Sequence, residues 1–319
     1  MVAVRREARR LDLGSIALME GVSHRLQREW NSGRSGDGSA RYVFLVNGLN
    51  LMDEKQMASS PGKHYQARIL ERRDISPDLW IVRIDPGGPF EFRAGQYATL
   101  GVAHEGKRLE RAYSIVSSPY EDALEFFVEL VPQGDLTPDL FKLKKGDTLM
   151  CRKIAKGRFM LDLRSGRTNH LLVSTVTGIA PFVSYVRTLY RDWKSGDGPM
   201  PGNHKLYCLQ GASRSWEFGY REELERYSNE APWFKYVPTV SRPWEDSNWK
   251  GETGRVDDLL RKYAYEWGLR AEETTAYLCG HPVMVENARG ILERAGWKKD
   301  TVFEEVYFQE AKSGSAGAG

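Results

Sequence analysis

Residues 64 to 166 carry short apolar runs that recur about every ten residues and are separated by turn residues such as Pro86-Gly87-Gly88-Pro89. Strands of this length and spacing are typical of a small antiparallel barrel. The runs predict strands at 65–71, 79–84, 92–100, around 111 and at 124–131. They also predict a short helix at 139–142 and a last barrel strand after Gly157-Arg158-Phe159.

From residue 167 to 308 the pattern changes, because apolar strand-like runs now alternate with longer segments of helical periodicity. The strands are predicted at 170–176, 205–210, 234–240, 275–279 and 303–308. The helices are predicted at 182–193, 221–227, 256–265 and 283–295. This alternation indicates an α/β domain with a doubly wound parallel sheet, whose ligands bind at the carboxyl ends of the strands.

The two ends of the chain differ from these two domains. Residues 1–63 begin with an Arg-rich stretch and contain a Gly/Ser-rich segment at 31–40, and we interpret them as an N-terminal extension to which the sequence assigns no role. Residues 309–319 are rich in Gly, Ser and Ala, which predicts a flexible tail.

Composition excludes several classes of protein. Of 319 residues, 41% are hydrophobic and 28% charged, which is typical of a globular protein, and no apolar run reaches the roughly 18 residues of a membrane span. We find no secretory signal. The three cysteines are far apart, which argues against a disulfide framework or a four-cysteine iron–sulfur cluster within the chain and favours a reducing, cytoplasmic location.

Charge gives no reason to expect a nucleic-acid partner. Residues 1–63 hold 10 of the 46 basic and 7 of the 43 acidic residues, so the rest of the chain holds 36 of each. The formal net charge of +3 therefore lies in the extension, and the two domains together are neutral. No cluster of residues with metal-ligand spacing is evident, and we expect no metal.

The stretch Arg111-Ala112-Tyr113-Ser114 combines three kinds of side chain that a flavin nucleotide requires. In a strand, Arg111 and Tyr113 share one face and Ser114 points to the other. A guanidinium suits a phosphate, an aromatic ring can lie on a planar ring, and a hydroxyl can bond a ring nitrogen. Taken alone, the stretch also fits an ordinary strand with a surface Arg.

The segment Gly134-Asp135-Leu136-Thr137 precedes a predicted helix. Gly lets the backbone approach a ligand, and a helix N-terminus with a Thr hydroxyl suits a phosphate. An ordinary N-cap is the alternative interpretation of Thr137.

These motifs occur with three others in a fixed order: Thr177-Gly178-Ile179-Ala180-Pro181, then Cys279-Gly280-His281-Pro282-x-Met284, then Glu305-Val306-Tyr307-Phe308. Over about residues 64–308 the chain resembles the ferredoxin–NADP(H) reductase family, and most of all its bacterial ferredoxin (flavodoxin)–NADP(H) reductases. The resemblance implies an antiparallel barrel that binds FAD, followed by an α/β domain that binds NADP(H).

The resemblance also implies roles for individual residues. Arg111 would bind the FAD pyrophosphate, with Ala112 in the same stretch, and Tyr113 would stack on the flavin. Ser114 would bond near flavin N5, Cys279 would lie near the nicotinamide, and Glu305 and Tyr307 would complete the catalytic group, with Tyr307 on the flavin face. The remaining cofactor contacts would be made by Val128, Leu130, Gly134, Leu136, Thr137, Thr177, Gly178 and Phe308.

Three arginines follow strand ends of the predicted parallel sheet. Arg214 lies past the second strand, Ser241 and Arg242 end the third, and Arg255 follows a Gly-containing loop before the next helix. Since these loops share one edge, the arginines can converge on the 2′-phosphate of NADPH. Bacterial NADP(H) reductases show a similar pattern, and this resemblance implies that Tyr220 covers the adenine. We therefore expect strong preference for NADPH over NADH. The alternative is three surface arginines in unrelated loops.

The leading hypothesis is an enzyme, a ferredoxin–NADP(+) reductase, that passes electrons between NADPH and ferredoxin or flavodoxin through FAD. One alternative is the reductase component of an oxygenase, and another is a flavin-binding electron-relay subunit. We expect a monomer. A basic rim for an acidic carrier is formed in sequence by Lys142, Lys144, Lys145, Arg152, Lys153, Lys156 and Arg158, although a run of charges is more often a solvated face.

Overall fold

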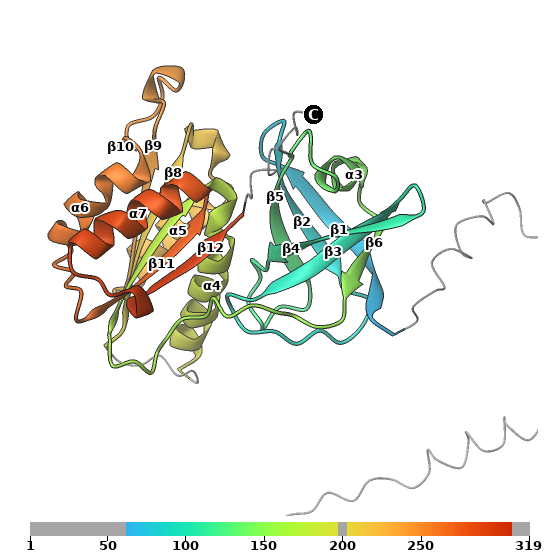
Figure 1. Ribbon diagram of the computed structural model, residues 1–319. Coiled ribbons are helices and arrows are strands. Elements are labelled where there is room, and N and C mark those ends of the chain that lie inside the picture. The colour runs from blue at the N-terminus through green and yellow to red at the C-terminus, as the bar shows by residue number, and fades with distance from the viewer. Residues whose placement is uncertain (1–61, 197–202, 308–319) are drawn as a thin grey trace, which may run out of the picture. The chain divides into compact units, whose positions relative to one another are not determined.

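The computed structural model describes residues 62–196 and 203–307 (Figure 1). Most of the predicted N-terminal extension, the tail and Phe308 lie outside these described residues. Two six-stranded sheets, one antiparallel and one parallel, organise the part of the chain that is described. The fold class predicted from the sequence is therefore confirmed.

The first sheet is antiparallel throughout, with strand order β4-β3-β6-β1-β2-β5. After β4, the amide of Val116 donates to the carbonyl of Glu125 on β5 over 2.8 Å, so the two edge strands approach one another and the sheet curls toward a barrel. The elements of this part are β1 (His64–Asp74), β2 (Leu79–Asp85), β3 (Tyr97–His104), β4 (Lys107–Ser114), β5 (Leu124–Glu129), α3 (Thr137–Lys142) and β6 (Thr148–Arg152).

Strand β2 is buried on both faces. Trp80, Val82 and Ile84 pack into the interior of the barrel. Leu79 and Ile81 point the other way and share a core with the helices that cover the parallel sheet. Because successive strand residues alternate between faces, this one strand contributes to two cores, and the barrel has an apolar outer face that the second domain covers.

The predicted last barrel strand is wrong, and so is the start of the strand predicted at 92–100. Strand β3 begins at Tyr97, β6 is the last strand of the barrel, and residues 157–164 form no strand. Phe159 is buried, and its carbonyl accepts a hydrogen bond from the hydroxyl of Tyr185, while the amide of Asp162 donates to the hydroxyl of Tyr277 over 2.8 Å. Side chains of the second domain thus satisfy backbone groups that a strand would otherwise pair.

The second sheet is parallel, with order β10-β9-β8-β7-β11-β12. Its strands are β7 (Asn169–Thr175), β8 (Lys205–Ala212), β9 (Phe234–Val240), β10 (Glu252–Thr253), β11 (Thr274–Gly280) and β12 (Val302–Val306). Its helices are α4 (Ala180–Ser195), α5 (Arg221–Glu230), α6 (Val256–Glu266) and α7 (Pro282–Arg294). Short 3₁₀ turns lie at η1 (Val176–Ile179), η2 (Ser215–Glu217), η3 (Pro243–Glu245) and η4 (Lys299–Thr301).

Helices cover both faces of the parallel sheet (Figure 1). Leu171 and Val173 of β7 face a core built with α6 and α7. Leu172, between them, faces the core built with α4 and α5, which also receives residues of β2 and β5. The alternation along β7 therefore explains why its run is continuously apolar, as expected for a central parallel strand.

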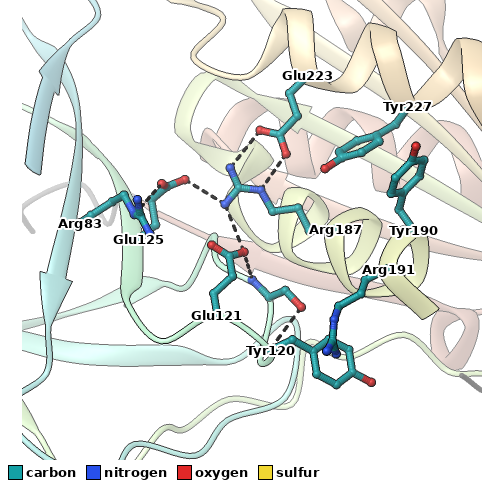
Figure 2. Close-up of a pocket in the computed structure, with 10 residues that line it drawn as sticks. Arg83, Tyr120, Glu121, Glu125, Arg187, Tyr190, Arg191, Glu223 and Tyr227 are labelled. Carbon is teal, nitrogen blue, oxygen red and sulfur yellow. Dashed lines mark hydrogen bonds and ion pairs between the residues drawn. The ribbon is translucent and has the colours of Figure 1, made fainter. Parts of the chain in front are cut away.

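An ion-pair cluster joins the barrel to α4 and α5 beside this shared core (Figure 2). Arg187 of α4 binds both carboxylate oxygens of Glu223 on α5, at 2.7 and 2.9 Å, and lies 3.0 Å from Glu125 of β5. Glu125 also accepts a hydrogen bond from the hydroxyl of Tyr220 over 2.9 Å. Because a buried charge is costly unless it is paired, the nearly buried Glu125 fixes how these two domains meet.

Among the helices of the described residues, none combines the length and the apolar character that crossing a membrane requires. The same part of the chain contains no group of three or more His, Cys, Asp or Glu residues able to hold a metal ion.

Candidate functional site

The barrel and the parallel sheet meet at a hydrogen bond between two predicted catalytic residues. The hydroxyl of Ser114, at the end of β4, donates to Oε1 of Glu305 on β12 over 2.5 Å. Burial raises the pKa of the Glu305 carboxyl above its ordinary value, and the hydrogen bond from Ser114 opposes part of that rise. Residues 191 positions apart in sequence thus form one polar contact at the domain junction.

Cys279 lies beside Glu305, because it is the residue of β11 that pairs with Glu305 of β12 in parallel register. The thiol is completely buried. Burial, reinforced by the Glu305 carboxylate, holds the pKa of Cys279 well above its ordinary value. The side chain is therefore a neutral thiol, able to contact an apolar or aromatic group but not to act as a thiolate nucleophile.

Tyr307 follows β12 and completes this group, which we call the hydride cluster: Ser114, Cys279, Glu305 and Tyr307. Its amide donates to the carbonyl of Gly280 over 3.2 Å, and its ring packs against the core shared by the two domains. Burial, Cys279 and Glu305 raise the pKa of the phenol well above its ordinary value. The hydroxyl oxygen is buried and has no hydrogen-bond partner of normal geometry among the described residues.

The two loops behind the hydride cluster interlock through close backbone contacts. A Cβ added to Gly178 would lie 2.3 Å from the carbonyl oxygen of Cys279. Gly280 has φ +130°, and a Cβ there would lie 2.3 Å from Oγ1 of Thr175. That same hydroxyl oxygen accepts the amide of His281 over 2.9 Å. Only glycine fits at 178 and 280, so the loops after β7 and β11 hold each other at a fixed distance.

Val176, between Thr175 and Thr177, has φ +42°, a left-handed conformation that is a genuine outlier for a β-branched residue. Its carbonyl accepts from the side-chain amide of Gln210 over 3.3 Å, and Tyr236 donates to Gln210 over 2.6 Å. The strained residue is held by buried groups of β8 and β9. Such strain often marks functional turns, and here it directly precedes Thr177 and Gly178, two predicted nicotinamide-site residues.

Three residues before Ser114 on β4, Arg111 reaches the loop that the sequence predicts to hold a pyrophosphate. Its Nη2 lies 3.1 Å from Oδ2 of Asp135, and Nη1 donates to the carbonyl of Glu110 over 2.9 Å. Ala112 is exposed, and Tyr113 is partly buried against the barrel core. Burial raises the pKa of the Tyr113 hydroxyl. The structure therefore brings Arg111 to the 134–137 loop, but with an acidic partner that sequence reasoning missed.

Within that loop, the hydroxyl of Thr137 is hydrogen-bonded to the backbone of a nearby residue, Val131. Its Oγ1 accepts from the amide of Val131 over 2.9 Å and donates to the carbonyl of Val131 over 3.1 Å, and the amide of Gly134 donates to the same carbonyl over 2.9 Å. Leu136 and Val128 are buried in the barrel core, with Leu130 packed against them. These residues shape the loop through packing, and the Thr137 hydroxyl is already engaged by the backbone of Val131.

Two of the three predicted phosphate-binding arginines converge, and they do so on a carboxylate. Arg214 Nε donates to Oε2 of Glu245 over 2.7 Å, and Nη2 contacts the same oxygen. Arg242 Nη1 lies 3.7 Å from Oε1 of Glu245. Arg214 Nη1 also lies 3.1 Å from Glu217. Glu217 and Glu245 were not found from the sequence, although each lies three residues after one of these arginines, the spacing at which ion pairs form on a helical turn.

Arg255 does not join them. Its Nε lies 3.3 Å from Oδ1 of Asp257, the first acidic residue of α6, whose other oxygen accepts from Asn287 of α7 over 2.8 Å. Ser241 is close to the pair through its backbone, since its amide donates to the carbonyl of Ala212 over 2.9 Å. The expected convergence of three arginines therefore holds for two, because Asp257 is a nearer partner for the third.

Tyr220 requires a correction. Its ring is buried, 3% exposed, edge-on to Phe127 of the barrel, and its hydroxyl donates to Glu125. A ring enclosed in this way has no free face for an adenine. Aromatic surface near the arginines is instead offered by Trp216 and Trp244, which are 48% and 75% exposed on the turns η2 and η3.

These positions are compatible with a flavin held between the domains. The hydride cluster offers a hydroxyl, a carboxyl and the unpartnered buried hydroxyl of Tyr307, and such groups suit the polar edge of a flavin or nicotinamide ring. Arg111, three residues before Ser114 on the same strand, contacts the 134–137 loop. The fold and this junction together define a two-domain oxidoreductase of the flavin- and nicotinamide-dependent class.

Comparison with known proteins identifies the family. An oxidoreductase FAD-binding domain matches residues 66–160, and an oxidoreductase NAD-binding domain matches residues 172–290. A ferredoxin–NADP reductase from Pseudomonas aeruginosa is 31% identical over 251 residues, which cover 73% of this chain and 91% of that protein. The chain therefore belongs to the ferredoxin–NADP reductase family of FAD-containing oxidoreductases.

Other relatives show the range of this family. The phenol hydroxylase P5 protein of Acinetobacter pittii is 30% identical over 255 residues, covering 79% of this chain and 68% of that protein. A solved ferredoxin NADP+ reductase from Neisseria gonorrhoeae with bound FAD and NADP superposes with a TM-score of 0.67 at 26% identity, covering 77% of this chain and 99% of the other.

Proposed function

We propose that this enzyme transfers electrons between NADPH and a one-electron carrier through FAD, as a ferredoxin–NADP(+) reductase. The observation that carries the proposal is the hydride cluster, in which Ser114 of the FAD-binding domain bonds Glu305 of the nucleotide-binding domain beside Cys279 and Tyr307. A cluster contributed by both domains would allow the reactive rings of the two cofactors to meet there, and bound FAD would supply the chemistry that divides a two-electron hydride into single electrons.

In this proposal Arg111 and the backbone of the 134–137 loop hold the FAD pyrophosphate, with Asp135 releasing Arg111 to it. Tyr113 would support the flavin ring, and Tyr307 would cover the flavin face that the nicotinamide has to reach. Thr177 and Gly178 would contact the nicotinamide, since they belong to the interlocked loops beside Cys279. Burial excludes water from the hydride path.

The hydrogen-bonded pair of Ser114 and Glu305 is suited to hold and transfer a proton. Since burial raises the pKa of Glu305, its carboxyl retains a proton at higher pH than an exposed glutamate. The hydroxyl of Ser114 is already hydrogen-bonded to that carboxyl, so with flavin bound the pair would be able to hold a proton and pass it on through Ser114.

We expect the carrier to dock at a basic segment, residues 153–156, next to the hydride cluster. Tyr97 pairs with Ser114 on one side and forms a bridge with Lys156 on the other. Lys153 and Lys156 flank Ile154, which is 70% exposed. Cations around an exposed apolar residue suit an acidic protein partner, and here they lie within two strands of the flavin-side serine.

A second candidate, the reductase component of an oxygenase, is favoured by the phenol hydroxylase P5 relative. The two functions share the flavin chemistry and differ in the carrier that receives the electrons. The free, buried state of all three cysteines supports a reducing compartment for either one.

The experiment has two stages. The purified protein, reconstituted with FAD, is assayed for NADPH-dependent reduction of ferricyanide, and then for reduction of an acidic ferredoxin and of a flavodoxin at increasing concentrations. We expect activity with ferricyanide and saturable rates with at least one carrier. Absence of ferricyanide reduction would refute the enzyme, and activity with ferricyanide alone would refute these carriers.

A charge-reversal pair checks the docking site. The double variant Lys153→Glu/Lys156→Glu should raise the carrier KM about tenfold and leave ferricyanide reduction unchanged. The control Lys298→Glu/Lys299→Glu makes the same charge change before β12, away from the basic segment, and should leave the carrier KM as it is.

A further inference from the structure

The guanidinium of Arg214 is fully engaged by two carboxylates. Nε and Nη2 contact Glu245, and Nη1 lies 3.1 Å from Glu217. Arg242 adds a second cation on the other oxygen of Glu245. Two positive and two negative charges therefore balance at the place where the sequence predicts a phosphate site. A phosphate can bind Arg214 only by replacing one of these carboxylates.

The two carboxylates are not equally replaceable. Glu217 is held independently of Arg214, because its Oε2 accepts the amide of Ser213 over 2.7 Å, and its side chain is 13% exposed. The side chain of Glu245 is 35% exposed, and its contacts within the described residues are with Arg214 and Arg242. Glu245 is therefore the carboxylate that can move away.

The backbone below the arginines does not need to move for this exchange. The amide of Arg242 donates to the carbonyl of Ser213 over 3.0 Å, which ties the turn after β9 to the turn after β8. The amide of Ser215 donates to Oδ2 of Asp246 over 2.9 Å, which ties η2 to the residue after η3. With the two turns fixed together, a rotation of the Glu245 side chain is sufficient to uncover both guanidinium groups.

We propose that Glu245 is a nucleotide-selectivity residue: its carboxylate competes with the 2′-phosphate of NADPH for Arg214 and Arg242, and it accepts the ribose 2′-hydroxyl of NADH when it stays in place. The proposal rests on the proposed use of NADPH and refines it. The enzyme then uses both nucleotides, and its preference for NADPH is weaker than it would be in a site with the same arginines and no competing carboxylate.

The chemistry of the two nucleotides gives the reason. A carboxylate accepts a hydrogen bond from a ribose hydroxyl, as acidic residues do in NAD sites, whereas it repels a phosphate dianion. The arginines, in contrast, can bind the phosphate through charged, bidentate hydrogen bonds. One site thus contains the binding group for each nucleotide, and the position of Glu245 decides which of them is presented.

The test compares wild type, Glu245→Gln and a control, Glu225→Gln. Glu225 forms an exposed ion pair with Arg221 on α5, so the control removes the same charge outside the site. Equilibrium binding is measured by calorimetry for adenosine 2′,5′-bisphosphate and for AMP, which differ by the 2′-phosphate. Steady-state kcat/KM is measured with NADPH and with NADH, using ferricyanide as acceptor.

Glu245→Gln should bind the bisphosphate about tenfold more tightly, equal to about 1.4 kcal/mol, and should raise the NADPH to NADH ratio of kcat/KM by a similar factor. AMP, which carries the 2′-hydroxyl that Glu245 accepts, should bind Glu245→Gln no more tightly than it binds wild type, and the control should bind both ligands as wild type does. An unchanged ratio, or weaker bisphosphate binding, in an otherwise active variant overturns the proposal while leaving the proposed function intact. Wild-type protein that oxidises neither nucleotide overturns both.

Discussion

The hydride cluster, at the junction of the two sheets, and the arginine turns after β8 and β9 of the parallel sheet are built in opposite ways. Cys279 is completely buried and Ser114 is 6% exposed, and the loops behind them are locked by backbone contacts of Gly178 and Gly280. The side chain of Arg242 is 49% exposed and that of Arg214 is held by carboxylates. The first region is fixed by shape, and the second is held by charges that can change partners.

This difference matches the role that we propose for each region. Hydride transfer requires two rings within contact distance, where a small displacement is costly. Nucleotide selection requires groups that bind one nucleotide more tightly than the other. The comparison predicts that steric changes should be most damaging near the hydride cluster, and that charge changes should act mildly and selectively at the turns.

The largest effect is expected from Gly178→Ala. The new Cβ would meet the carbonyl oxygen of Cys279 at 2.3 Å, and neither backbone can yield easily. We expect a loss of about 3 kcal/mol in unfolding free energy, at the upper end for overpacking, and at least a hundredfold loss of kcat with NADPH. Urea unfolding and steady-state kinetics measure the two quantities.

A control for this substitution lies on α7. Gly290→Ala places its Cβ 3.2 Å from the flexible end of Arg294, in a helix where Ala is favoured over Gly by up to about 1 kcal/mol. It should leave kcat unchanged and unfolding free energy equal or higher. If Gly178→Ala behaved like Gly290→Ala, the loops could not be rigidly interlocked.

An intermediate effect is expected from pH, at the opposite end of β7 from the site. Burial, aided by His204, lowers the pKa of His170 to about 4. Because the unfolded chain binds this proton near pH 6.5, the native state should keep its full stability above that pH. It should lose about 2–3 kcal/mol as pH falls from 6.5 to 4.

Unfolding free energies between pH 4 and 7 check this expectation. In His170→Phe the slope of stability against pH should become shallower, with a remainder from His204, whose pKa burial also lowers. His104→Phe, at a side chain that is 46% exposed, serves as the control and should retain the slope. Equal slopes in wild type and His170→Phe would contradict the assignment.

The smallest effect separates the arginines themselves. Arg214→Ala should reduce NADPH affinity about tenfold, since one charged contact is worth about 1.5–3 kcal/mol, and should barely affect NADH. Arg255→Ala should change NADPH affinity by less than about threefold, because Arg255 pairs with Asp257 instead. Equal losses in the two variants would show that all three arginines reach the phosphate.

Much of the fold could be predicted from periodicity. Strand β9 was predicted to the residue, and the helices of the parallel sheet to within a few residues, because each strand and helix presents an unbroken apolar face. The two-residue strand β10 was missed, since two residues carry no period. The strand after Gly157 failed because Phe159 and Asp162 bond to Tyr185 and Tyr277, which no local pattern reveals.

The candidate site was predicted unevenly for a similar reason. The motifs identified Ser114, Glu305 and Cys279, and the structure brings these residues together. They did not identify the acidic partners of the arginines, because an ion pair depends on which loops lie next to one another. Tyr220 was misassigned because its sequence position is near the arginines while its ring points into the domain interface.

Strand β2, with Trp80 in one core and Leu79 and Ile81 in another, limits how this molecule can be recombined. An FAD-binding domain expressed alone would expose Leu79, Ile81 and Phe127 to water as an apolar patch, which favours aggregation. A chimera that takes one domain from a relative must also take the surface of the other domain that packs against it. The two domains are therefore a single unit for folding and for exchange, although the chain passes through them one after the other.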